Sequence, residues 1–295
     1  MRGFGPVFYM YLQTSRFQID LRCPRVMGIV NVTPDSFSDG GRHAGTSAAL
    51  HHCEQLLRDG ADILDIGGES TRPGAPAVPQ DEELARVVPL VREAAKFGVP
   101  LSVDTYKPAV MQAVLDLGAD IVNDIRALQE PGAAEMVARH PSCGVCLMHM
   151  HRNPQTMQVA PMAGDVLPAV RAFLNQAALR LLTLGVARER ILIDPGIGFG
   201  KTVAQNFSLL ARQGALLDLG FPLLAGWSRK SSLGAVAMVE GLAPEPTARL
   251  GASVAAALLA VERGASIVRV HDVLDTVQAL KVLRAMQDQS CMNQS

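Results

Sequence analysis

The 295-residue sequence lacks the features that mark a membrane protein or a nucleic-acid-binding protein. No stretch approaches the roughly 18 consecutive apolar residues of a membrane span. The most apolar helix-like segment covers only residues 252–261. Basic residues are not in excess, since 27 Lys and Arg stand against 28 Asp and Glu. We therefore expect neither a membrane nor a nucleic acid as partner. With 48% hydrophobic residues, the chain can bury a large globular core.

The cysteines also lack a disulfide framework, because the five of them are odd in number and irregularly spaced. This usage predicts a reducing, cytoplasmic location, and no cleavage site for an export signal follows the apolar residues near the start. Cys143 and Cys146 are spaced as C-x-x-C, but residues three apart on a strand face opposite sides of a sheet. Without a second such pair, core packing is favoured over a zinc or redox site.

Short runs of β-branched and apolar residues alternate along the chain with segments of helical periodicity. The expected strands are residues 27–33, 62–67, 100–105, 120–125, 144–150, 190–195, 222–228 and 266–272. The expected helices are residues 47–58, 80–97, 108–117, 131–139, 165–184, 203–219, 246–263 and 273–287. Six glycines between a helix and the next strand are expected to be left-handed caps: Gly60, Gly98, Gly118, Gly185, Gly220 and Gly264.

Eight strand and helix pairs without hairpin signals predict an α/β fold with an all-parallel sheet, closed as a single (β/α)8 TIM barrel. The alternative is an open doubly wound sheet, which gathers its ligand groups at one switch point. We expect the barrel over residues 17–288, after a poorly defined extension over 1–16 and before a flexible tail over 289–295. The segment before the first expected strand, including residues 17–21, is expected to plug the bottom of the barrel as a short hairpin.

Polar side chains at the carboxyl end of nearly every expected strand favour the barrel over the open sheet. They are Asn31, residues 69–72, Asp104, Asn123, Asp124, His149, Asp194, residues 228–230, Arg269 and His271. The carboxyl ends of all strands meet at one rim of a barrel, where ligands bind. Two connecting loops at this rim, residues 31–41 and 67–75, are long and rich in turn residues, which indicates that they cover a ligand.

The motifs at these strand ends resemble those of the dihydropteroate synthases. They are GIVNVTPDSFSDGG at 28–41, GGESTRPG at 67–74, SVDT at 102–105, ND at 123–124, DPGIGFGK at 194–201, SRKS at 228–231 and RVHD at 269–272. The resemblance runs in family order from about residue 17 to residue 286. It implies a (β/α)8 barrel that joins 6-hydroxymethyl-7,8-dihydropterin pyrophosphate to p-aminobenzoate, giving 7,8-dihydropteroate and pyrophosphate in folate biosynthesis.

The resemblance also implies how the pterin is bound. Asp194 and Asn123 would meet its amino end, Asp104 a ring nitrogen, and Lys230 its carbonyl side. Since a pterin edge carries both donors and acceptors, a pocket that offers carboxylates, an amide and an ammonium suits it. The implied pterin set is Thr71, Asp104, Asn123, Ile125, Met148, Asp194, Phe199, Lys230 and Arg269. The implied catalytic residues are Asp104, Lys230, Arg269 and His271.

A second set is implied for the pyrophosphate, which leaves more readily when cations and a metal ion absorb its charge. This set is Asn31, Arg72, Arg269 and His271. Because Arg269 and His271 are two positions apart, a strand would point both to the same side. The resemblance implies Mg²⁺ as the cofactor, with Asn31 as a ligand, and Asp35 is a candidate to complete its shell.

For p-aminobenzoate the implied set is Phe37, Arg72, Pro73, Lys230 and Ser231. Ser231 begins a short helix expected over residues 231–239, and the free amide groups at its start favour the carboxylate of this substrate. The family further implies a homodimer and inhibition by sulfonamides that compete with p-aminobenzoate.

Two motifs look like ligand sites but have simpler explanations. Residues 196–202 read GIGFGKT, yet Pro195 stands where a phosphate-binding P-loop requires its first glycine. We expect these glycines to let the loop pass close under the pterin. His149 and His151 lack a third ligand at metal-binding spacing, so packing or hydrogen bonding is favoured. After His149 the sequence departs from the family's Met-Gln-Gly pattern, and the role of this loop is open.

Two alternative functions are compatible with the same fold. A pterin-dependent methyltransferase would have no use for the pyrophosphate residues Asn31, Arg269 and His271. An inactive pterin-binding paralogue would have no use for reactive residues on both loops. We therefore expect a transferase with the family's activity.

Overall fold

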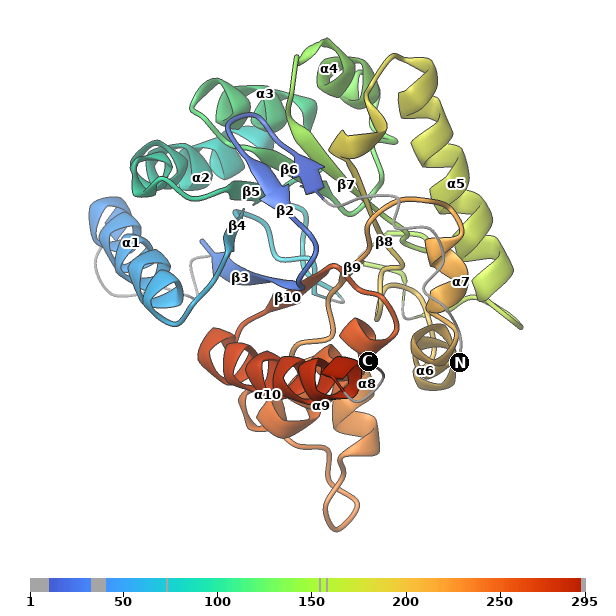
Figure 1. The fold of residues 1–295 in the computed structure, drawn as a ribbon. Helices are drawn as coiled ribbons and strands as arrows, with labels where there is room; N and C mark the ends of the chain where they lie inside the picture. Colours follow the sequence, from blue (N-terminus) through green and yellow to red (C-terminus); the bar gives the residue numbers. More distant parts are fainter. Residues whose placement is uncertain (1–10, 33–40, 73, 154, 158, 293–295) are drawn as a thin grey trace.

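The computed structural model describes residues 11–32, 41–72, 74–153, 155–157 and 159–292, and its central feature is a ring of parallel strands (Figure 1). The strands are β3 (Arg25–Asn31), β4 (Ile63–Gly67), β5 (Leu101–Asp104), β6 (Ile121–Asp124), β7 (Gly144–Met148), β8 (Ile191–Asp194), β9 (Leu224–Ala225) and β10 (Ile267–Val270). Their order in the sheet is β8-β7-β6-β5-β4-β3-β10-β9. A parallel bridge between Ile193 and Leu223 closes the ring. The TIM barrel is thereby confirmed, and the open sheet is excluded.

Helices form the outer layer of the barrel (Figure 1). The α-helices are α1 (Gly41–Arg58), α2 (Gln80–Ala94), α3 (Pro108–Asp116), α4 (Ala133–Arg139), α5 (Leu167–Thr183), α6 (Val203–Ala211), α7 (Gly214–Leu217), α8 (Ser231–Val236), α9 (Leu250–Glu262) and α10 (Val273–Met292). Short 3₁₀ turns are η2 (Ala95–Phe97), η3 (Arg188–Arg190) and η4 (Pro246–Arg249). The six glycines expected as left-handed caps all have a positive φ, between 69° and 100°, which confirms that prediction.

Several expected boundaries were wrong where side chains or turns interrupt a helix. The single helix expected over 203–219 is broken into α6 and α7. The buried Gln213 side chain donates to Ala260 O at 2.8 Å, and Gly214 is a weak helix former. The helix expected over 231–239 ends at Val236, because Val239 and Leu242 pair in a tight turn. α10 continues to Met292, beyond the residue 289 expected to start a tail.

The hydrophobic core has two layers separated by the strands. The outer layer lies between strands and helices and contains residues such as Val26, Leu64 and Val122. The inner layer fills the barrel and consists of Leu12, Ile19, Met27, Ile63, Ile121, Cys146, Leu192, Leu224 and Ile267. Cys143 belongs to the outer layer and Cys146 to the inner one. This separation confirms that the C-x-x-C spacing reflects core packing.

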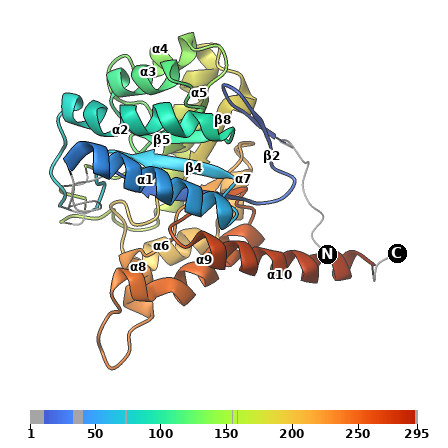
Figure 2. The ribbon, with the colours of Figure 1, turned by 90° about the vertical axis from the view of Figure 1, so that its left-hand side faces the viewer.

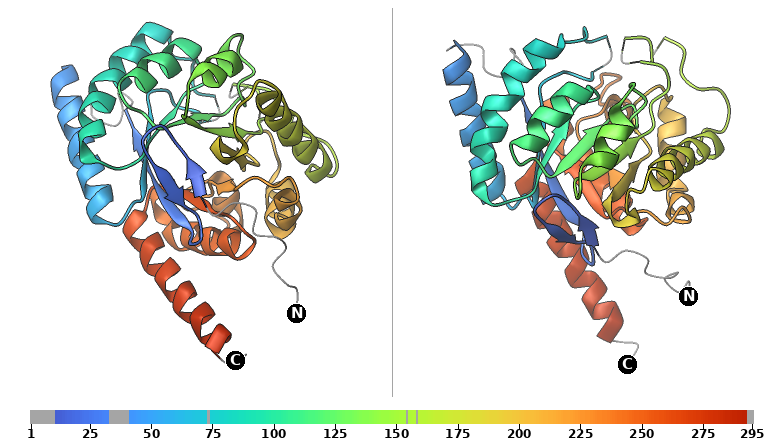
Figure 3. Two further views of the ribbon diagram at one scale, coloured as in Figure 1. Left: turned by 45° about the horizontal axis from the view of Figure 1, so that its top comes forward. Right: turned by 90° about the horizontal axis from the view of Figure 1, so that it is seen from above.

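A hairpin of β1 (Tyr11–Gln13) and β2 (Gln18–Asp20) covers the amino end of the barrel (Figure 3). Its Leu12 and Ile19 complete the inner core layer. Arg16 at its turn donates from Nη2 to the buried Asp120 Oδ2 at 2.6 Å, and Leu101 N donates to the same oxygen at 2.9 Å. The hairpin expected before the first barrel strand is thereby confirmed. It begins at Tyr11, inside the extension expected to be poorly defined, because a three-residue strand is too short to leave a periodic signal.

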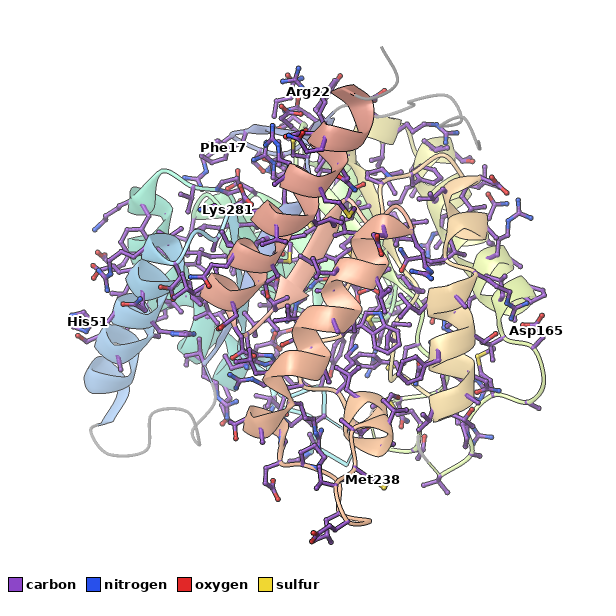
Figure 4. The ribbon with its side chains drawn as sticks, turned by 60° about the horizontal axis from the view of Figure 1, so that its bottom comes forward. Phe17, Arg22, His51, Asp165, Met238 and Lys281 are labelled. Atoms are coloured by element: carbon purple, nitrogen blue, oxygen red, sulfur yellow. The ribbon has the colours of Figure 1, made fainter. Side chains whose placement is uncertain are left out.

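The two ends of the barrel carry different elements. In Figure 2 the hairpin and the end of α10 lie on one side, and α8 lies on the other. Figure 4 likewise places Phe17 and Arg22 at the opposite end from Met238, with α9 and α10 side by side between them. In the described parts of the chain, no helix is both long enough and apolar enough to cross a membrane.

Candidate active site

Six polar side chains gather in the mouth of the barrel, five of them from its strands and one from the start of α8, and we call them the mouth cluster. They are Asp65, Asp104, Asn123, Asp194, Lys230 and Arg269. All four acidic and amide members are buried. The strand register explains the grouping, because Asp104 pairs with Asn123, and Met148 pairs with Asp194. Alternation along the strands directs Asp65, Asn123, Asp194 and Arg269 toward the barrel axis, each two positions after an inner-core residue.

Arg269 is the central cation of the mouth cluster. Its Nε donates to Asp65 Oδ2 at 2.6 Å, and its Nη2 donates to Asp104 Oδ2 at 2.9 Å. Asn123 Nδ2 lies 3.4 Å from both carboxylate oxygens of Asp65. Burial alone would lower the pKa of Arg269, but the charges of Asp65 and Asp104 outweigh this effect and raise it. The guanidinium is therefore a fixed positive charge between two carboxylates.

Asp104 is the titratable member of this arrangement. Burial raises its pKa to about 7, against the opposing attraction of Arg269, and the charges of Asp65 and Glu83 raise it further. An acid with such a pKa exchanges its proton near neutral pH. A carboxyl at this position can therefore either accept a hydrogen bond from a ring N–H or donate one to a ring nitrogen.

Asp194 and Lys230 form the opposite side of the mouth cluster. Asp194 Oδ1 accepts a hydrogen bond from Gly196 N at 2.7 Å. Burial raises the pKa of Asp194, although the charge of Lys230 opposes the shift. Burial lowers the pKa of Lys230 to about 8, with Asp194 opposing it. Lys230 Nζ donates to Ile197 O and lies 4.9 Å from the centre of the Phe199 ring.

An apolar cluster lies next to these charges, and we call it the apolar wall. Its buried members are Tyr106, Ile125 and Met148, and Met150 and Phe199 pack against them. Flat heterocycles bind in pockets that combine such apolar surfaces with a few fixed polar groups. Ile125, Met148 and Phe199, which are all expected to contact the pterin ring, therefore lie together. They lie beside the residues expected to bind its polar edge.

The expected pyrophosphate residues surround the end of β10. Ser228 Oγ accepts a hydrogen bond from His271 N at 3.1 Å and lies 3.0 Å from His271 Nδ1. Because this hydroxyl can donate its own proton to Nδ1, the imidazole proton is assigned to Nε2. Burial lowers the pKa of His271 to about 3, and the charges of Arg229, Arg269 and Arg72 lower it further. A neutral donor among three cations is suited to an anion.

The expected p-aminobenzoate residues are only partly within the described structure. Lys230 is the N-cap residue of α8, and Ser231 is the exposed first residue of that helix. Arg72 is exposed on the loop after β4, where Thr71 precedes it. Phe37, Pro73 and the expected metal ligand Asp35 lie outside the described residues.

Comparison with known proteins places this site in a family. The model of the pterin binding enzymes matches residues 27–271. The dihydropteroate synthase of Neisseria meningitidis serogroup B is 50% identical over 93% of this chain and 96% of its own length. The dihydropteroate synthase of Escherichia coli strain K12 is 48% identical over 94% of this chain and 96% of its own length.

Solved structures give the same result. Xanthomonas albilineans dihydropteroate synthase with 4-aminobenzoic acid has a TM-score of 0.86 and 48% identity, covering 94% of this chain and 98% of its own. The Burkholderia cenocepacia enzyme complexed with 7,8-dihydropteroate has a TM-score of 0.84 and 51% identity, covering 96% and 98%. The chain belongs to the dihydropteroate synthases, within the pterin binding enzymes. It is accordingly a transferase.

Asp65 is the residue of this dihydropteroate synthase site that the sequence analysis missed. It is fully buried and holds both Arg269 and Asn123. A signal for it existed, because a single carboxylate interrupts the apolar strand Ile63–Gly67. Buried carboxylates are retained where a partner neutralises them, so an acidic residue inside a predicted strand indicates a polar site in the barrel.

The P-loop-like segment has a different role in this barrel. Lys201 is buried, and its Nζ donates to Gly196 O at 2.8 Å and Phe199 O at 3.1 Å. A Cβ on Gly196 would lie 1.9 Å from His149 O, so the loop packs tightly against the end of β7. The lysine that a P-loop would use for phosphate instead ties together the backbone under Phe199.

The two histidines after β7 do not form part of a metal cluster in the part of the chain that is described. His149 is buried, and its ring meets Phe173 edge-on with 5.0 Å between centres. Burial lowers the pKa of His149 to about 3, with a further contribution from Lys201. His151 is half-buried and its Nε2 accepts from Arg152 Nε at 3.4 Å. Packing therefore accounts for His149.

Asn31 is suitably placed for the expected Mg²⁺. It ends β3, and a Cβ on the neighbouring Gly67 would lie 3.9 Å from Asn31 Oδ1 and 3.6 Å from Asp104 Cβ. The amide oxygen therefore faces the mouth of the barrel on the same side as Asp104. An amide oxygen is a ligand that Mg²⁺ accepts, and this ion keeps several waters, so a single protein oxygen at this position fits it.

Proposed function

We propose that the mouth cluster binds the pterin of 6-hydroxymethyl-7,8-dihydropterin pyrophosphate and that the chain joins this substrate to p-aminobenzoate. The observation that carries the proposal is that Asp194 and Lys230 lie close enough for each to shift the pKa of the other, beside the apolar wall. A carboxylate accepts from the donor groups of a pterin edge, and a neighbouring ammonium donates to its carbonyl. Asn123 and Asp104 supply the remaining polar contacts, with Thr71 at the rim.

The bond changes use few protein groups. The C–O bond between the pterin methylene and pyrophosphate breaks, and its electron pair leaves on the pyrophosphate oxygen. The amine of p-aminobenzoate forms the new C–N bond and releases a proton to solvent. Positive charge that develops on the methylene is stabilised by the carboxylates of Asp104 and Asp194. The reaction is thus driven by electrostatics and positioning rather than by a protein nucleophile.

The pyrophosphate is bound in this proposal by the cations around β10. His271 donates from Nε2, and Arg72 and Arg269 supply positive charge. Mg²⁺, held by Asn31 and by Asp35, would neutralise charge on the leaving group. The support for this assignment is the mouth-facing amide oxygen of Asn31 and the contact of Ser228 Oγ with His271 Nδ1.

The second substrate is placed by the same reasoning at the start of α8. Ser231 and Lys230 lie where the carboxylate of p-aminobenzoate would be bound, and Phe37, Arg72 and Pro73 would enclose its ring. A sulfonamide complex is known for the Yersinia pestis relative, which has a TM-score of 0.87 and 46% identity. Competition by sulfonamides at this subsite is part of the proposal for this chain.

A coupled assay of pyrophosphate release with both substrates tests the function. We expect release that depends on p-aminobenzoate and on Mg²⁺. A methyltransferase would transfer a methyl group and release no pyrophosphate, and an inactive paralogue would bind pterin without any release. Absence of release from folded, pterin-binding protein would therefore overturn the proposal. Removal of Mg²⁺ by a chelator is expected to lower turnover while pterin-fragment binding persists.

A homodimer and a cytoplasmic location belong to the same proposal. The support for a dimer is the exposed apolar side chains along adjoining helices α9 and α10, among them Leu259, Val282 and Met286. The support for a reducing compartment is the free thiols of Cys53 and Cys143. Sedimentation analysis tests the dimer, and a monomer at micromolar concentration would exclude it.

A further inference from the structure

The loop after β4 is tied at its base to two other elements by a buried ion network. Lys107 Nζ donates to Glu69 Oε2 and to Glu83 Oε2. The three side chains are almost enclosed, with exposed fractions of 13% for Lys107, 8% for Glu69 and 1% for Glu83. Glu69 follows β4, Lys107 follows the neighbouring strand β5, and Glu83 lies in α2. Removing one partner from such a network leaves an unpaired buried charge.

Two further contacts press the same loop against α2. Arg86 Nη1 donates to Gly68 O at 2.7 Å. A Cβ on Gly68 would lie 2.7 Å from Val87 Cγ1, so only glycine permits this approach. The loop therefore leaves β4 along one fixed path before it reaches Thr71 and Arg72.

Tyr106 joins this network to the pterin pocket. Its hydroxyl donates to Glu69 Oε1 at 3.2 Å. Its ring is buried in the apolar wall with Ile125 and Met148. The Arg126 guanidinium carbon lies 3.8 Å from the ring centre, which adds a cation–π contact. One side chain thus contacts both the pterin wall and the base of the loop that carries Arg72.

We infer that Tyr106, Lys107 and Glu83 are positioning residues, which hold residues 68–72 against the pterin pocket so that Arg72 meets the second substrate. The inference rests on the proposed function, in which Arg72 contacts pyrophosphate and p-aminobenzoate. A loop held at its base loses less freedom when a ligand orders its tip, which increases affinity for that ligand. The network therefore acts on p-aminobenzoate binding and leaves pterin recognition to the mouth cluster.

The test uses Tyr106→Phe and Glu83→Gln in the full chain. Tyr106→Phe removes the hydroxyl contact with Glu69 and keeps the ring in the apolar wall. We expect each variant to raise the KM for p-aminobenzoate at least fivefold, with kcat and the Kd of a pterin fragment within twofold of the parent. A variant that merely misfolds would lower kcat through its active fraction and leave KM unchanged. Glu135→Gln, at the exposed pair with Arg180, is the matched control and should change neither constant.

Two measurements make the outcome decisive. If Tyr106 acts through the loop, Tyr106→Phe should raise KM no further in an Arg72→Ala background, whereas additive effects would overturn the inference. Hydrogen exchange of residues 68–72, which needs no substrate, should speed up at least fivefold in both variants and not in Glu135→Gln. Unchanged exchange would overturn the inference even if the chain is active. Faster exchange in a chain that releases no pyrophosphate would instead locate the failure in the proposed function.

Discussion

Arg269 Nε lies 2.6 Å from Asp65 Oδ2, although the two residues are 204 positions apart in the sequence. They extend from β10 and β4, and β3 lies between these strands. The ion pair therefore crosses the inside of the barrel above β3, and Arg269 reaches on to Asp104 of β5. One guanidinium thus fixes the relative positions of carboxylates on β4 and β5 at the mouth of the barrel.

Asp65→Asn tests this arrangement. The change keeps the size of the side chain but removes the charge that holds Arg269, so Arg269 should shift toward Asp104 and Asn123 should lose its anchor. We expect the Kd of a pterin fragment to rise about tenfold, or about 1.4 kcal/mol. Calorimetry measures this Kd. Asp62→Asn, at the other end of β4 where Asp62 pairs with Arg25 at 3.0 Å, is the control. An equal effect of both variants would show that Asp65 has no special part in binding.

Asp194→Ala and His271→Ala separate pterin recognition from leaving-group binding. Asp194→Ala leaves the donor edge of the pterin unpaired at a cost of about 1–3 kcal/mol, so binding of a pterin fragment without pyrophosphate should weaken by tenfold or more. His271→Ala should leave fragment binding within twofold but lower turnover with the pyrophosphate substrate. Both quantities come from calorimetry and steady-state kinetics. Equal loss of fragment binding in two folded variants would contradict this division of the site.

The pH dependence of fragment binding follows from the two shifted groups of the mouth cluster. Asp104 has a pKa raised to about 7, so it gains its proton and loses its negative charge as the pH falls through 7. Lys230 has a pKa lowered to about 8, so it loses its positive charge as the pH rises through 8. We expect affinity for a pterin fragment to be greatest between these values and to fall on both sides.

Two variants check which residue causes the fall in affinity at acid pH and which causes the fall at alkaline pH. Lys230→Arg keeps its charge above pH 8 and should remove the alkaline fall. His271→Ala should leave both falls in affinity unchanged, because the pKa of His271 is lowered to about 3. If the fall in affinity at acid pH disappears in His271→Ala, the titration of Asp104 is not its cause.

Arg16→Ala tests the plug at the amino end. Arg16 donates three hydrogen bonds to the buried carboxylate of Asp120, from Nε to both oxygens and from Nη2 to one. Because the Arg16 side chain is 30% exposed, we expect a loss of about 2–3 kcal/mol in the free energy of unfolding. Urea denaturation measures it. Arg22→Ala, at the exposed pair with Asp20, should produce no measurable change. A similar loss in both variants would rule out a specific role for Asp120.

The sequence was sufficient to predict the order of elements, because strand and helix periodicities and the six glycine caps are local signals. The sequence was insufficient to predict contacts that form only when the barrel closes and distant elements meet. Asp65 and Arg269 meet across β3, and no spacing in the chain encodes that distance. The break between α6 and α7 depends on Gln213 reaching Ala260 O in α9, which is a tertiary contact. The hairpin was predicted but its first strand was not, since Leu12 becomes a core residue only when the barrel is present beneath it.

The barrel is closed between β8 and β9 by the single bridge of Ile193 and Leu223, whereas its other neighbouring strands share at least two paired positions. Lys230 Nζ, donating to Ile197 O, adds a side-chain link between the loops that follow these same two strands. An ammonium has three N–H donors, so Lys230 can keep its bond to Ile197 O while it donates to the carbonyl of a pterin, as the proposed function requires. The side chain proposed to recognise the pterin is therefore also one that holds together the two sides of the seam between β8 and β9.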